Sequence, residues 1–263
     1  MIARPQVSRV IPKRVFVLGG TGTIGRATVR ALVRRGYEVV SLVRPLAGVA
    51  GCLSPAKSAR LLSGATVRIG DVTDPASLAR DGIRNERFDV LVSCLASRTG
   101  APEDAWAIDY RAHVHALKVA RAAGVGHVVL LSAICVQKPL LAFQQAKLAF
   151  ERELMDSGMT YSIVRPTAFF KSLCGQVARV RAGKPFLVFG DGTLTACKPI
   201  SDDDLAEYLA GCIEDPNRHN RVLPIGGAGA PITPRQQGER LFALLGREPR
   251  FKQVPVEGVA AAS

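Results

Sequence analysis

The sequence contains no apolar run long enough to cross a lipid bilayer. A membrane-spanning helix needs about 18 consecutive apolar residues, whereas the longest run, Val128 to Val136, is strand-like and contains Ser132. The chain starts with basic and then apolar residues, as a signal peptide would, but the apolar part is short and leads into glycines without a small-residue cleavage site. We therefore expect a cytoplasmic protein that starts with a basic arm and a strand.

Residues that bind metals or form disulfides are few and poorly spaced. The six cysteines lie far apart without a C-x-x-C pair, and there are only four histidines. His113 and His115 are poorly spaced for one helical face. No metal site is expected, and reduced cytosolic thiols are the simplest interpretation of the cysteines.

Acidic residues are scarce at the start of the chain, where none precedes Glu38. The whole chain has a formal net charge of +13, and Arg26, Arg30 and Arg34 form a stripe at i, i+4 and i+8 of an expected helix. The stripe is either a solvated face or a surface that attracts an anionic membrane or an acidic ligand. Nucleic acid is not an expected partner, because no helix-turn-helix, zinc-finger or RRM-type pattern accompanies the charge.

Apolar segments of strand length alternate with helical segments along most of the chain. Strands that are apolar throughout are typical of a parallel sheet covered on both faces. The pattern predicts an α/β fold with a Rossmann-type, doubly wound parallel sheet. The expected strands are residues 14–20, 37–44, 65–72, 88–96, 126–134 and 160–167, and the expected helices include 23–36 and 103–123.

These segments divide the chain into three parts. We expect residues 1–12 to form a basic N-terminal arm and residues 13–167 to form the Rossmann domain. Residues 168–263 contain shorter elements, which we expect to form a substrate-binding lobe: the segment PFLVFG and helices at 201–213 and 234–245.

The strongest motif is VLGGTGTIG, in which Gly19, Gly22 and Gly25 lie between the first strand and the first helix. Glycines there permit a tight turn and close approach of the backbone to a pyrophosphate, which lies at the helix N-terminus. The motif predicts a dinucleotide cofactor. The residues expected to contact it are Gly19, Thr21, Gly22, Thr23, Ile24 and Gly25.

The residues that follow the second and third predicted strands indicate which dinucleotide binds. A free ribose 2′-hydroxyl favours Asp or Glu at the end of the second strand, but this chain has Arg44 there and no carboxylate. An arginine pairs with a 2′-phosphate through a charge-assisted fork, so NADPH is the expected cofactor unless Arg44 is simply an exposed loop residue. After the third strand, Asp71 is expected to bind the adenine amino group and Val72 to pack on the ring.

Further candidates follow the fourth and fifth strands. Leu95 and Ala96 end the fourth strand close to the expected nicotinamide, and Ser132 ends the fifth. Phe143 and Lys147 are four residues apart, so both side chains point from one helical face. The segment LLAFQQAKLAFE resembles the Tyr-x-x-x-Lys segment of short-chain dehydrogenases, except that phenylalanine replaces the tyrosine that passes a proton.

The core resembles the extended and atypical short-chain dehydrogenases, and among them the NmrA-like group. The stretch 161–206, with VRPTAFFKSL, GKPF, FGDG and CKPIS in order, resembles the NADPH-dependent divinyl chlorophyllide 8-vinyl reductases of chlorophyll and bacteriochlorophyll biosynthesis. LLAFQQAKLAFE and the segment 223–251 continue this resemblance, which covers about residues 13 to 254. Members of that family continue past the point where this chain stops at VPVEGVAAAS, so we expect a truncated substrate lobe with reduced or absent activity as one possibility.

The resemblance implies an NADPH-dependent oxidoreductase that reduces the 8-vinyl group of a magnesium tetrapyrrole, divinyl chlorophyllide or protochlorophyllide, to ethyl. Lys147 would be the catalytic residue and bind the nicotinamide ribose. Carbonyl reduction needs an acid near the oxygen, whereas a conjugated macrocycle can delocalise the charge, so a phenylalanine that stacks on the ring is compatible.

The same resemblance implies contacts with the substrate. The aromatic residues of the lobe are expected either to contact a large flat ligand or to be core residues of the lobe: Phe169, Phe170, Phe186 and Phe189. Lys171 and Lys198 are candidates for pairing with a propionate carboxylate of the substrate. The expected substrate residues are Phe143, Phe169, Phe170, Lys171, Phe189 and Lys198. Peripheral association with an anionic photosynthetic membrane would also fit the basic N-terminal face.

Two other functions are open from the sequence. Another NmrA-like reductase would bind NADPH and act on an isoflavone-like or quinone substrate. A non-catalytic NADP(H)-binding sensor, or an assembly factor for a membrane complex, would be consistent with the missing tyrosine and the short C-terminus, although the specific stretch 161–206 opposes it.

Overall fold

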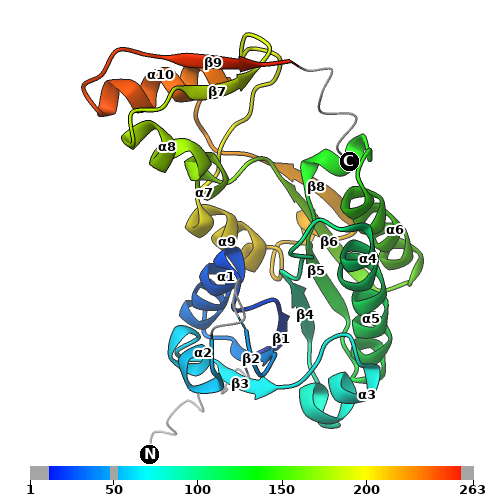
Figure 1. Ribbon diagram of the computed structural model, residues 1–263. Helices are drawn as coiled ribbons and strands as arrows, with labels where there is room; N and C mark the ends of the chain where they lie inside the picture. Colours follow the sequence, from blue (N-terminus) through cyan, green and yellow to red (C-terminus); the bar gives the residue numbers. More distant parts are fainter. Residues whose placement is uncertain (1–11, 48–52, 256–263) are drawn as a thin grey trace, which may run out of the picture.

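A seven-stranded parallel sheet forms the centre of the molecule (Figure 1). The computed structural model describes residues 12–47 and 53–255. The spatial order of the strands is β3-β2-β1-β4-β5-β6-β8, and each neighbouring pair is parallel. The predicted Rossmann-type sheet is confirmed. The strands are β1 (Arg14–Leu18), β2 (Glu38–Val43), β3 (Thr66–Ile69), β4 (Val90–Ser93), β5 (His127–Leu131), β6 (Thr160–Pro166) and β8 (Arg221–Ile225).

Helices connect the strands and lie on both faces of the sheet (Figure 1). The predicted helix 103–123 is a run of α4, a π-helical segment η2 and α5. Neither α2 nor the α3–η1 segment is among the predicted helices, because short helices show too little periodicity. Their starts do carry a signal, since Ser54 and Asp74 are N-cap residues that a proline follows. The helices are α1 (Thr23–Arg34), α2 (Pro55–Leu61), α3 (Pro75–Ser77), η1 (Leu78–Ile83), α4 (Pro102–Ala105), η2 (Trp106–Ala112), α5 (His113–Ala122), η3 (Ile134–Gln137), α6 (Ala142–Asp156), α7 (Phe170–Leu173), η4 (Cys174–Gln176), α8 (Val177–Arg181), α9 (Asp202–Gly211), η5 (Pro216–Arg218) and α10 (Pro234–Leu244).

The strands have apolar side chains on both faces, and these make two separate cores. Val15 and Val17 of β1 pack in a core with α1 and α9, whereas Phe16 and Leu18 pack in a core with α5 and α6. All four side chains are at most 2% exposed. Because successive strand residues point to opposite faces, a strand buried on both sides needs apolar residues at successive positions, which is the pattern of β1.

The arginine stripe of α1 faces the acidic side of α9. Arg30 Nη2 lies 2.8 Å from Asp203 Oδ1, and Arg34 and Arg35 lie 2.6 and 2.9 Å from the carboxylate of Glu207. Beneath these pairs the apolar faces of the two helices share the first core. Two of the three stripe arginines are therefore balanced by acids of the same molecule, and the stripe is part of a helix–helix contact.

A small lobe lies beyond one end of the sheet (Figure 1). Its two strands are parallel, and its core contains Val180, Phe186 and Phe242, with the Phe251 ring packed edge-on against both other rings. Phe186 is 4% exposed and is a core residue of the lobe. The lobe consists of α8, β7 (Phe186–Phe189), α10 and β9 (Phe251–Val254).

Residues after position 167 are divided between the main sheet and the small lobe. β8 pairs with β6 at the edge of the sheet, and α9 packs on α1. From the sequence, both segments belong to the predicted lobe, and β8 is not among the predicted strands because its short sequence RVLPI includes a proline. The division into three parts stays a prediction, and residues 1–11 of the N-terminal arm and 256–263 lie outside the described residues. Among the residues that are described, no helix is both long and apolar enough to span a membrane.

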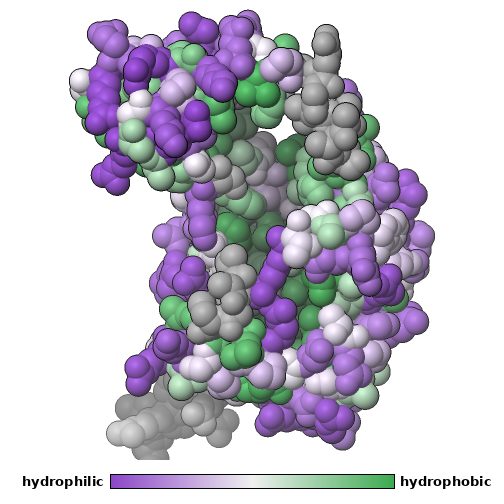
Figure 2. All heavy atoms as spheres, viewed as in Figure 1, coloured by the Kyte–Doolittle hydropathy of each residue, from purple (hydrophilic) through white to green (hydrophobic). Residues whose placement is uncertain are grey.

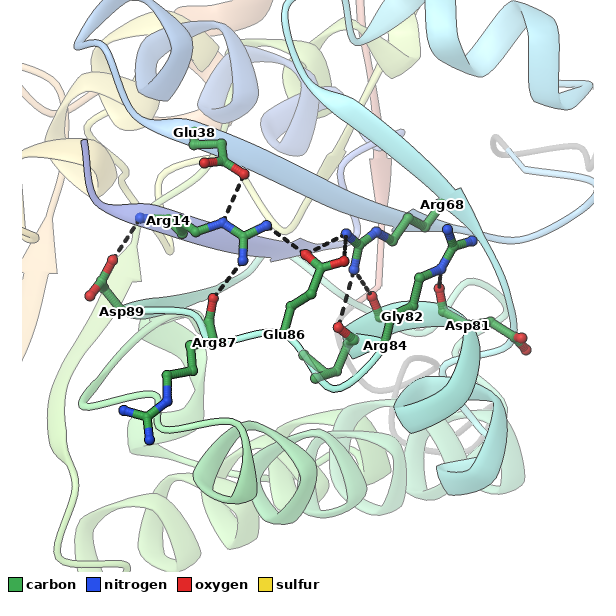
Figure 3. A network of polar contacts seen from close by, with 10 residues as sticks. Arg14, Glu38, Arg68, Asp81, Gly82, Arg84, Glu86, Arg87 and Asp89 are labelled. Carbon is green, nitrogen blue, oxygen red and sulfur yellow. Dashed lines mark hydrogen bonds and ion pairs between the residues drawn. The ribbon is translucent and has the colours of Figure 1, made fainter. Parts of the chain in front are cut away.

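A network of ion pairs joins the amino ends of the strands, away from the glycine turn (Figure 3). Glu86 accepts hydrogen bonds from Arg68 at 2.7 Å and from Arg14 at 2.6 Å, and Arg14 also binds Glu38 at 2.7 Å. The Arg68 side chain is only 7% exposed and donates to the carbonyl oxygen of Gly82. Glu86 therefore holds two arginines, one of them buried, against the segment that leads into β4.

Replacing Glu86 with glutamine is expected to lower the free energy of unfolding by about 1 kcal/mol at neutral pH, because a partly exposed ion pair contributes little more than that. Hydrogen bonds from Arg68 and then Arg14 hold the pKa of Glu86 below its usual range. A depressed pKa stabilises the fold above the unfolded-state value of about 4.3. The difference between wild type and variant should therefore be full above about pH 5 and vanish as pH falls through the folded-state pKa.

Urea unfolding between pH 3 and 7 measures this difference. Glu103→Gln, on the exposed surface of α4, is the control and should show little change. A difference for Glu86→Gln that is the same at every pH would mean that the charge of Glu86 does not stabilise the fold.

Candidate cofactor and active site

The residues expected to form the site follow the carboxyl ends of the strands. The glycine turn follows β1, Arg44 follows β2, Asp71 follows β3 and Ser132 follows β5. The order of strands reverses between β1 and β4. In open α/β sheets, ligands bind beyond the carboxyl ends of the strands at such a switch point.

The glycine turn is closed against the protein on one side and open on the other. Gly19 has φ +74°, and a Cβ there would lie 2.5 Å from the carbonyl of Cys94, while a Cβ on Gly25 would lie 2.1 Å from the Gly19 oxygen. Among residues 12–47 and 53–255, a Cβ on Gly22 would meet only the Gly19 oxygen, at 3.3 Å. Gly22 is also the N-cap of α1, whose first turn has no acidic residue. The N–H groups at this helix end are therefore available to an anion.

Gly22→Ala and Gly25→Ala are expected to separate binding from folding. The methyl group of Gly25→Ala collides with the backbone, which should cost about 3 kcal/mol of stability. The methyl group of Gly22→Ala enters the open space, so the protein should keep its melting temperature but bind NADPH at least about tenfold more weakly. Thermal denaturation and NADPH titration of both variants test this, and a Gly25→Ala variant with normal stability would contradict the packing argument.

A pocket of about 550 Å³ lies between the ends of β2 and β3. Arg44 is exposed there and forms no ion pair with a described residue, so its guanidinium is available to a ligand. Asp71 Oδ1 accepts hydrogen bonds from the backbone and hydroxyl of Thr73 at 2.8 and 2.7 Å. Val72 is 7% exposed and packs in the second core, so an adenine ring would meet only a small part of it. The pocket is lined by Arg44, Pro45, Leu46, Ile69, Gly70, Asp71, Ser77 and Asp81.

The end of β4 lies beside the glycine turn, where Leu95 is half-buried and Ala96 is exposed. Beneath them, Ser93 Oγ lies 2.9 Å from His113 Nε2, and His113 Nδ1 lies 2.9 Å from the carbonyl oxygen of Ile108. Burial, and then the charge of Lys147, lowers the pKa of His113 to about 4. The ring is therefore neutral at physiological pH, with the proton on Nδ1 and the Ser93 hydroxyl donating to Nε2.

Lys147 forms an ion pair that the sequence analysis did not foresee. Its Nζ lies 3.0 Å from Asp109 Oδ1, and the side chains of Lys147 and Asp109 are 11% and 0% exposed. Asp109 belongs to the π-helical segment η2 and also accepts a hydrogen bond from the backbone of Ser97 at 3.3 Å. The carboxylate therefore fixes the ammonium group next to the end of β4. In the sequence, Asp109 is one of three acidic residues of the predicted helix 103–123, and nothing distinguishes it from the other two.

Ser132 takes part in a second buried network. Its hydroxyl donates to Glu151, whose carboxylate also pairs with the guanidinium of Arg165. The Glu151 side chain is fully buried, and that of Arg165 is 13% exposed. Glu151 is one turn after Lys147 on α6, so Phe143, Lys147 and Glu151 recur at i, i+4 and i+8. This spacing could have indicated Glu151 from the sequence.

The predicted substrate residues differ in exposure. Phe143 and Phe169 are half-buried, whereas Phe170 and Phe189 are 54% and 53% exposed. Figure 2 shows the molecule hollowed between the small lobe and the sheet, with hydrophobic residues inside the hollow.

The two predicted substrate lysines lie in different surroundings. Lys171 Nζ donates to Thr23 Oγ1 at 2.6 Å, at the start of α1. Lys198 is exposed, and among the described residues no side-chain partner of its ammonium group is found. The structure therefore places Lys171 beside the glycine turn and leaves Lys198 available to another group.

These features fit a nicotinamide dinucleotide: a turn with room for a pyrophosphate, a free arginine at the end of β2 and a fixed lysine on α6. The sequence model of a family described as NAD(P)H-binding matches residues 19–216. The chain belongs to the NAD(P)H-binding family. The glycine turn, Arg44, Asp71, Ser132 and Lys147 all lie within the matched range.

Relatives of this NAD(P)H-binding chain include plant and cyanobacterial proteins. The chain is 53% identical over 253 residues to a chloroplastic divinyl chlorophyllide a 8-vinyl-reductase of Oryza sativa subsp. indica, which covers 94% of the chain and 62% of the rice protein. It is 26% identical over 251 residues to the photosystem II assembly factor Ycf39 of Synechocystis, covering 92% of the chain and 71% of that protein. The chain thus spans about 62% of the length of the rice relative.

Among solved structures, an NADPH-dependent quinone oxidoreductase from Escherichia coli in complex with NADPH resembles the chain with a TM-score of 0.75. The two are 21% identical, and the alignment covers 94% of this chain and 81% of the other. This likeness supports the fold of the NAD(P)H-binding family.

Proposed function

We propose that this chain reduces the 8-vinyl group of divinyl chlorophyllide or protochlorophyllide to an ethyl group, with NADPH as the reductant, in chlorophyll or bacteriochlorophyll biosynthesis. The observation that carries the proposal is the 53% identity to the rice divinyl chlorophyllide a 8-vinyl-reductase along 94% of the chain.

The residues at this edge support NADPH as the cofactor. Gly22 and the start of α1 would hold the pyrophosphate, and the free guanidinium of Arg44 would pair with the 2′-phosphate. Lys147, fixed by Asp109 at 3.0 Å, would hold the nicotinamide ribose. Bound there, NADPH supplies a hydride.

The groups around Lys147 are poor acids, which favours reduction of a carbon–carbon bond. Phe143 has no proton to donate, and the hydroxyl proton of Ser132 is already donated to Glu151. His113 is neutral, and burial raises the pKa of the Cys94 thiol to about 11. A carbonyl oxygen would need an acid here. Hydride addition to a vinyl group leaves charge that the macrocycle delocalises, and water can then protonate the carbon.

Two exposed aromatic residues support a large, flat substrate. Phe170 and Phe189 are 54% and 53% exposed, whereas Phe143 and Phe169 are half-buried, and aromatic faces stack on a planar macrocycle. Lys198 would pair with a propionate carboxylate of the tetrapyrrole, because its ammonium group is exposed and has no ion-pair partner among the described residues.

Peripheral association with an anionic membrane is proposed for the small lobe rather than for the α1 stripe. Figure 2 shows hydrophilic residues over the visible face of the lobe, and its basic residues outnumber its acidic residues, Asp191, Glu239 and Glu248. Its basic residues are Arg179, Arg181, Lys184, Arg235, Arg240, Arg247, Arg250 and Lys252. The protein should sediment with phosphatidylglycerol vesicles, and the double variant Arg240→Glu/Lys252→Glu should not. Equal binding to phosphatidylcholine would contradict the proposal.

The reductase activity is tested by incubating the purified protein with NADPH and divinyl chlorophyllide. We expect a blue shift of the pigment absorption and a mass gain of two hydrogen atoms. No conversion, with NADPH binding intact, would favour a non-catalytic NADP(H)-binding protein, and conversion of a quinone instead would favour another reductase.

Phe143→Tyr is expected to leave the dissociation constant of NADPH within about twofold of wild type, because a single hydroxyl on a half-buried ring adds no contact with the cofactor phosphates. It should also leave vinyl reduction largely intact, since the reaction does not need a phenol. Fluorescence titration and the pigment assay measure both quantities. A large gain in turnover would show that the reaction does use an acid at this position.

A further inference from the structure

Lys171 lies where the chain that leads to the small lobe passes the glycine turn. It belongs to α7, which follows β6, yet its Nζ donates to Thr23 Oγ1 at 2.6 Å. Thr23 is the first residue of α1. The two residues are 148 positions apart in the chain, so only the tertiary structure brings this ammonium group to the start of the helix.

No acid balances the charge at this position. Within the described residues Lys171 forms no ion pair, and the Thr23 hydroxyl that it contacts is neutral. The first turn of α1 has no acidic residue, and its N-cap Gly22 has no side chain that could accept a hydrogen bond. The ammonium group and the positive end of the helix therefore lie side by side, an arrangement that an anion stabilises.

Of the three glycines of the motif, Gly22 is the one at which the described residues leave space for that anion. Gly19 and Gly25 are closed by neighbouring backbone atoms at 2.5 and 2.1 Å from a Cβ, whereas Gly22 is open apart from one contact at 3.3 Å. Gly22 directly precedes Thr23 in the chain. The opening of the turn and the Lys171 ammonium group are thus next to each other.

We propose that Lys171 binds the pyrophosphate of the dinucleotide, and thereby ties the segment after β6 to the bound cofactor. This assignment replaces a contact with the substrate propionate by a contact with the cofactor, and leaves Lys198 for the propionate. It rests on NAD(P)H binding by this family and does not depend on which substrate is reduced.

Titration of NADPH without substrate tests the assignment. Lys171→Ala is expected to raise the dissociation constant by about tenfold to a hundredfold, the usual effect of losing a hydrogen bond to a charged group, and to weaken its salt dependence. Lys171→Arg should restore the affinity to within about threefold. Lys184→Ala removes an exposed lysine of the small lobe and should leave the dissociation constant unchanged.

A second ligand shows whether Lys171 contacts the pyrophosphate or another part of the cofactor. Adenosine 2′-phosphate has no phosphate that could reach the glycine turn, so Lys171→Ala should not change its affinity, measured by competition with NADPH. An equal loss of affinity for NADPH and for adenosine 2′-phosphate would overturn the assignment. So would an unchanged NADPH affinity combined with a higher KM for the tetrapyrrole. If vinyl reduction itself is not observed, these titrations still decide the role of Lys171, because they contain no substrate.

Discussion

Lys147→Ala is expected to lower kcat/KM for vinyl reduction by at least about a hundredfold, because a group that fixes the hydride donor contributes through orientation. The lysine is 11% exposed and lies 3.0 Å from Asp109, so few positions of its ammonium group are available. The pigment assay at saturating NADPH measures the change in kcat, and NADPH titration measures the accompanying change in affinity.

A loss of folding must be separated from this loss of catalysis. Lys147→Ala leaves the Asp109 carboxylate, whose side chain is 0% exposed, without its cation, which costs about 3 kcal/mol. The double variant Lys147→Ala/Asp109→Asn removes that buried charge and should recover most of the stability without recovering turnover. Lys118→Ala, on the exposed surface of α5, is the control for removing a lysine. Near-normal turnover by the folded double variant would show that Lys147 does not orient the cofactor.

Glu151→Ala is expected to produce the largest loss of stability. The change leaves the Arg165 guanidinium, 13% exposed, without its carboxylate and leaves the Ser132 hydroxyl without its acceptor. Breaking a buried pair by removing one partner costs about 3–5 kcal/mol. For a chain of this size, that loss lowers the melting temperature by about 10 °C.

Thermal denaturation at neutral pH tests this expectation, with Asp156→Asn as the control, since Asp156 is an exposed carboxylate at the end of the same helix. Glu151→Gln keeps the size of the side chain and one acceptor, so its loss should be smaller than that of Glu151→Ala. Equal melting temperatures for wild type and Glu151→Ala would mean that desolvation of the two charges already cancels their attraction.

The sequence was informative about the cofactor half of the site because of the parallel topology. In a parallel sheet, the carboxyl end of each strand reaches the same edge, so the residues that follow the apolar runs can be assigned to one site. Gly19, Arg44, Asp71 and Ser132 follow β1, β2, β3 and β5 in this way. Local periodicity was sufficient to locate the strand ends that these residues follow, and it predicted six strands of the main sheet.

The partners of these residues could not be read from the sequence. Asp109 approaches Lys147 from another helix, and Arg165 approaches Glu151 from β6. The seventh strand, β8, was missed because RVLPI is short and becomes a strand by pairing with β6. Each of these features depends on which element packs on which, and periodicity within one element does not carry that information.

The sequence by itself therefore determined the parallel sheet, the glycine turn and the order in which the candidate cofactor residues follow the strands, since these depend on local pattern and on strand direction. The tertiary structure decided which charges meet: Arg30 with Asp203, Lys147 with Asp109, and Lys171 with Thr23 at the start of α1. Such pairs join segments that are distant in the chain, and their positions follow from the packing of the two cores and the connection to the small lobe. For Lys171, the contact with Thr23 is the reason why we propose that it binds the cofactor and not the substrate.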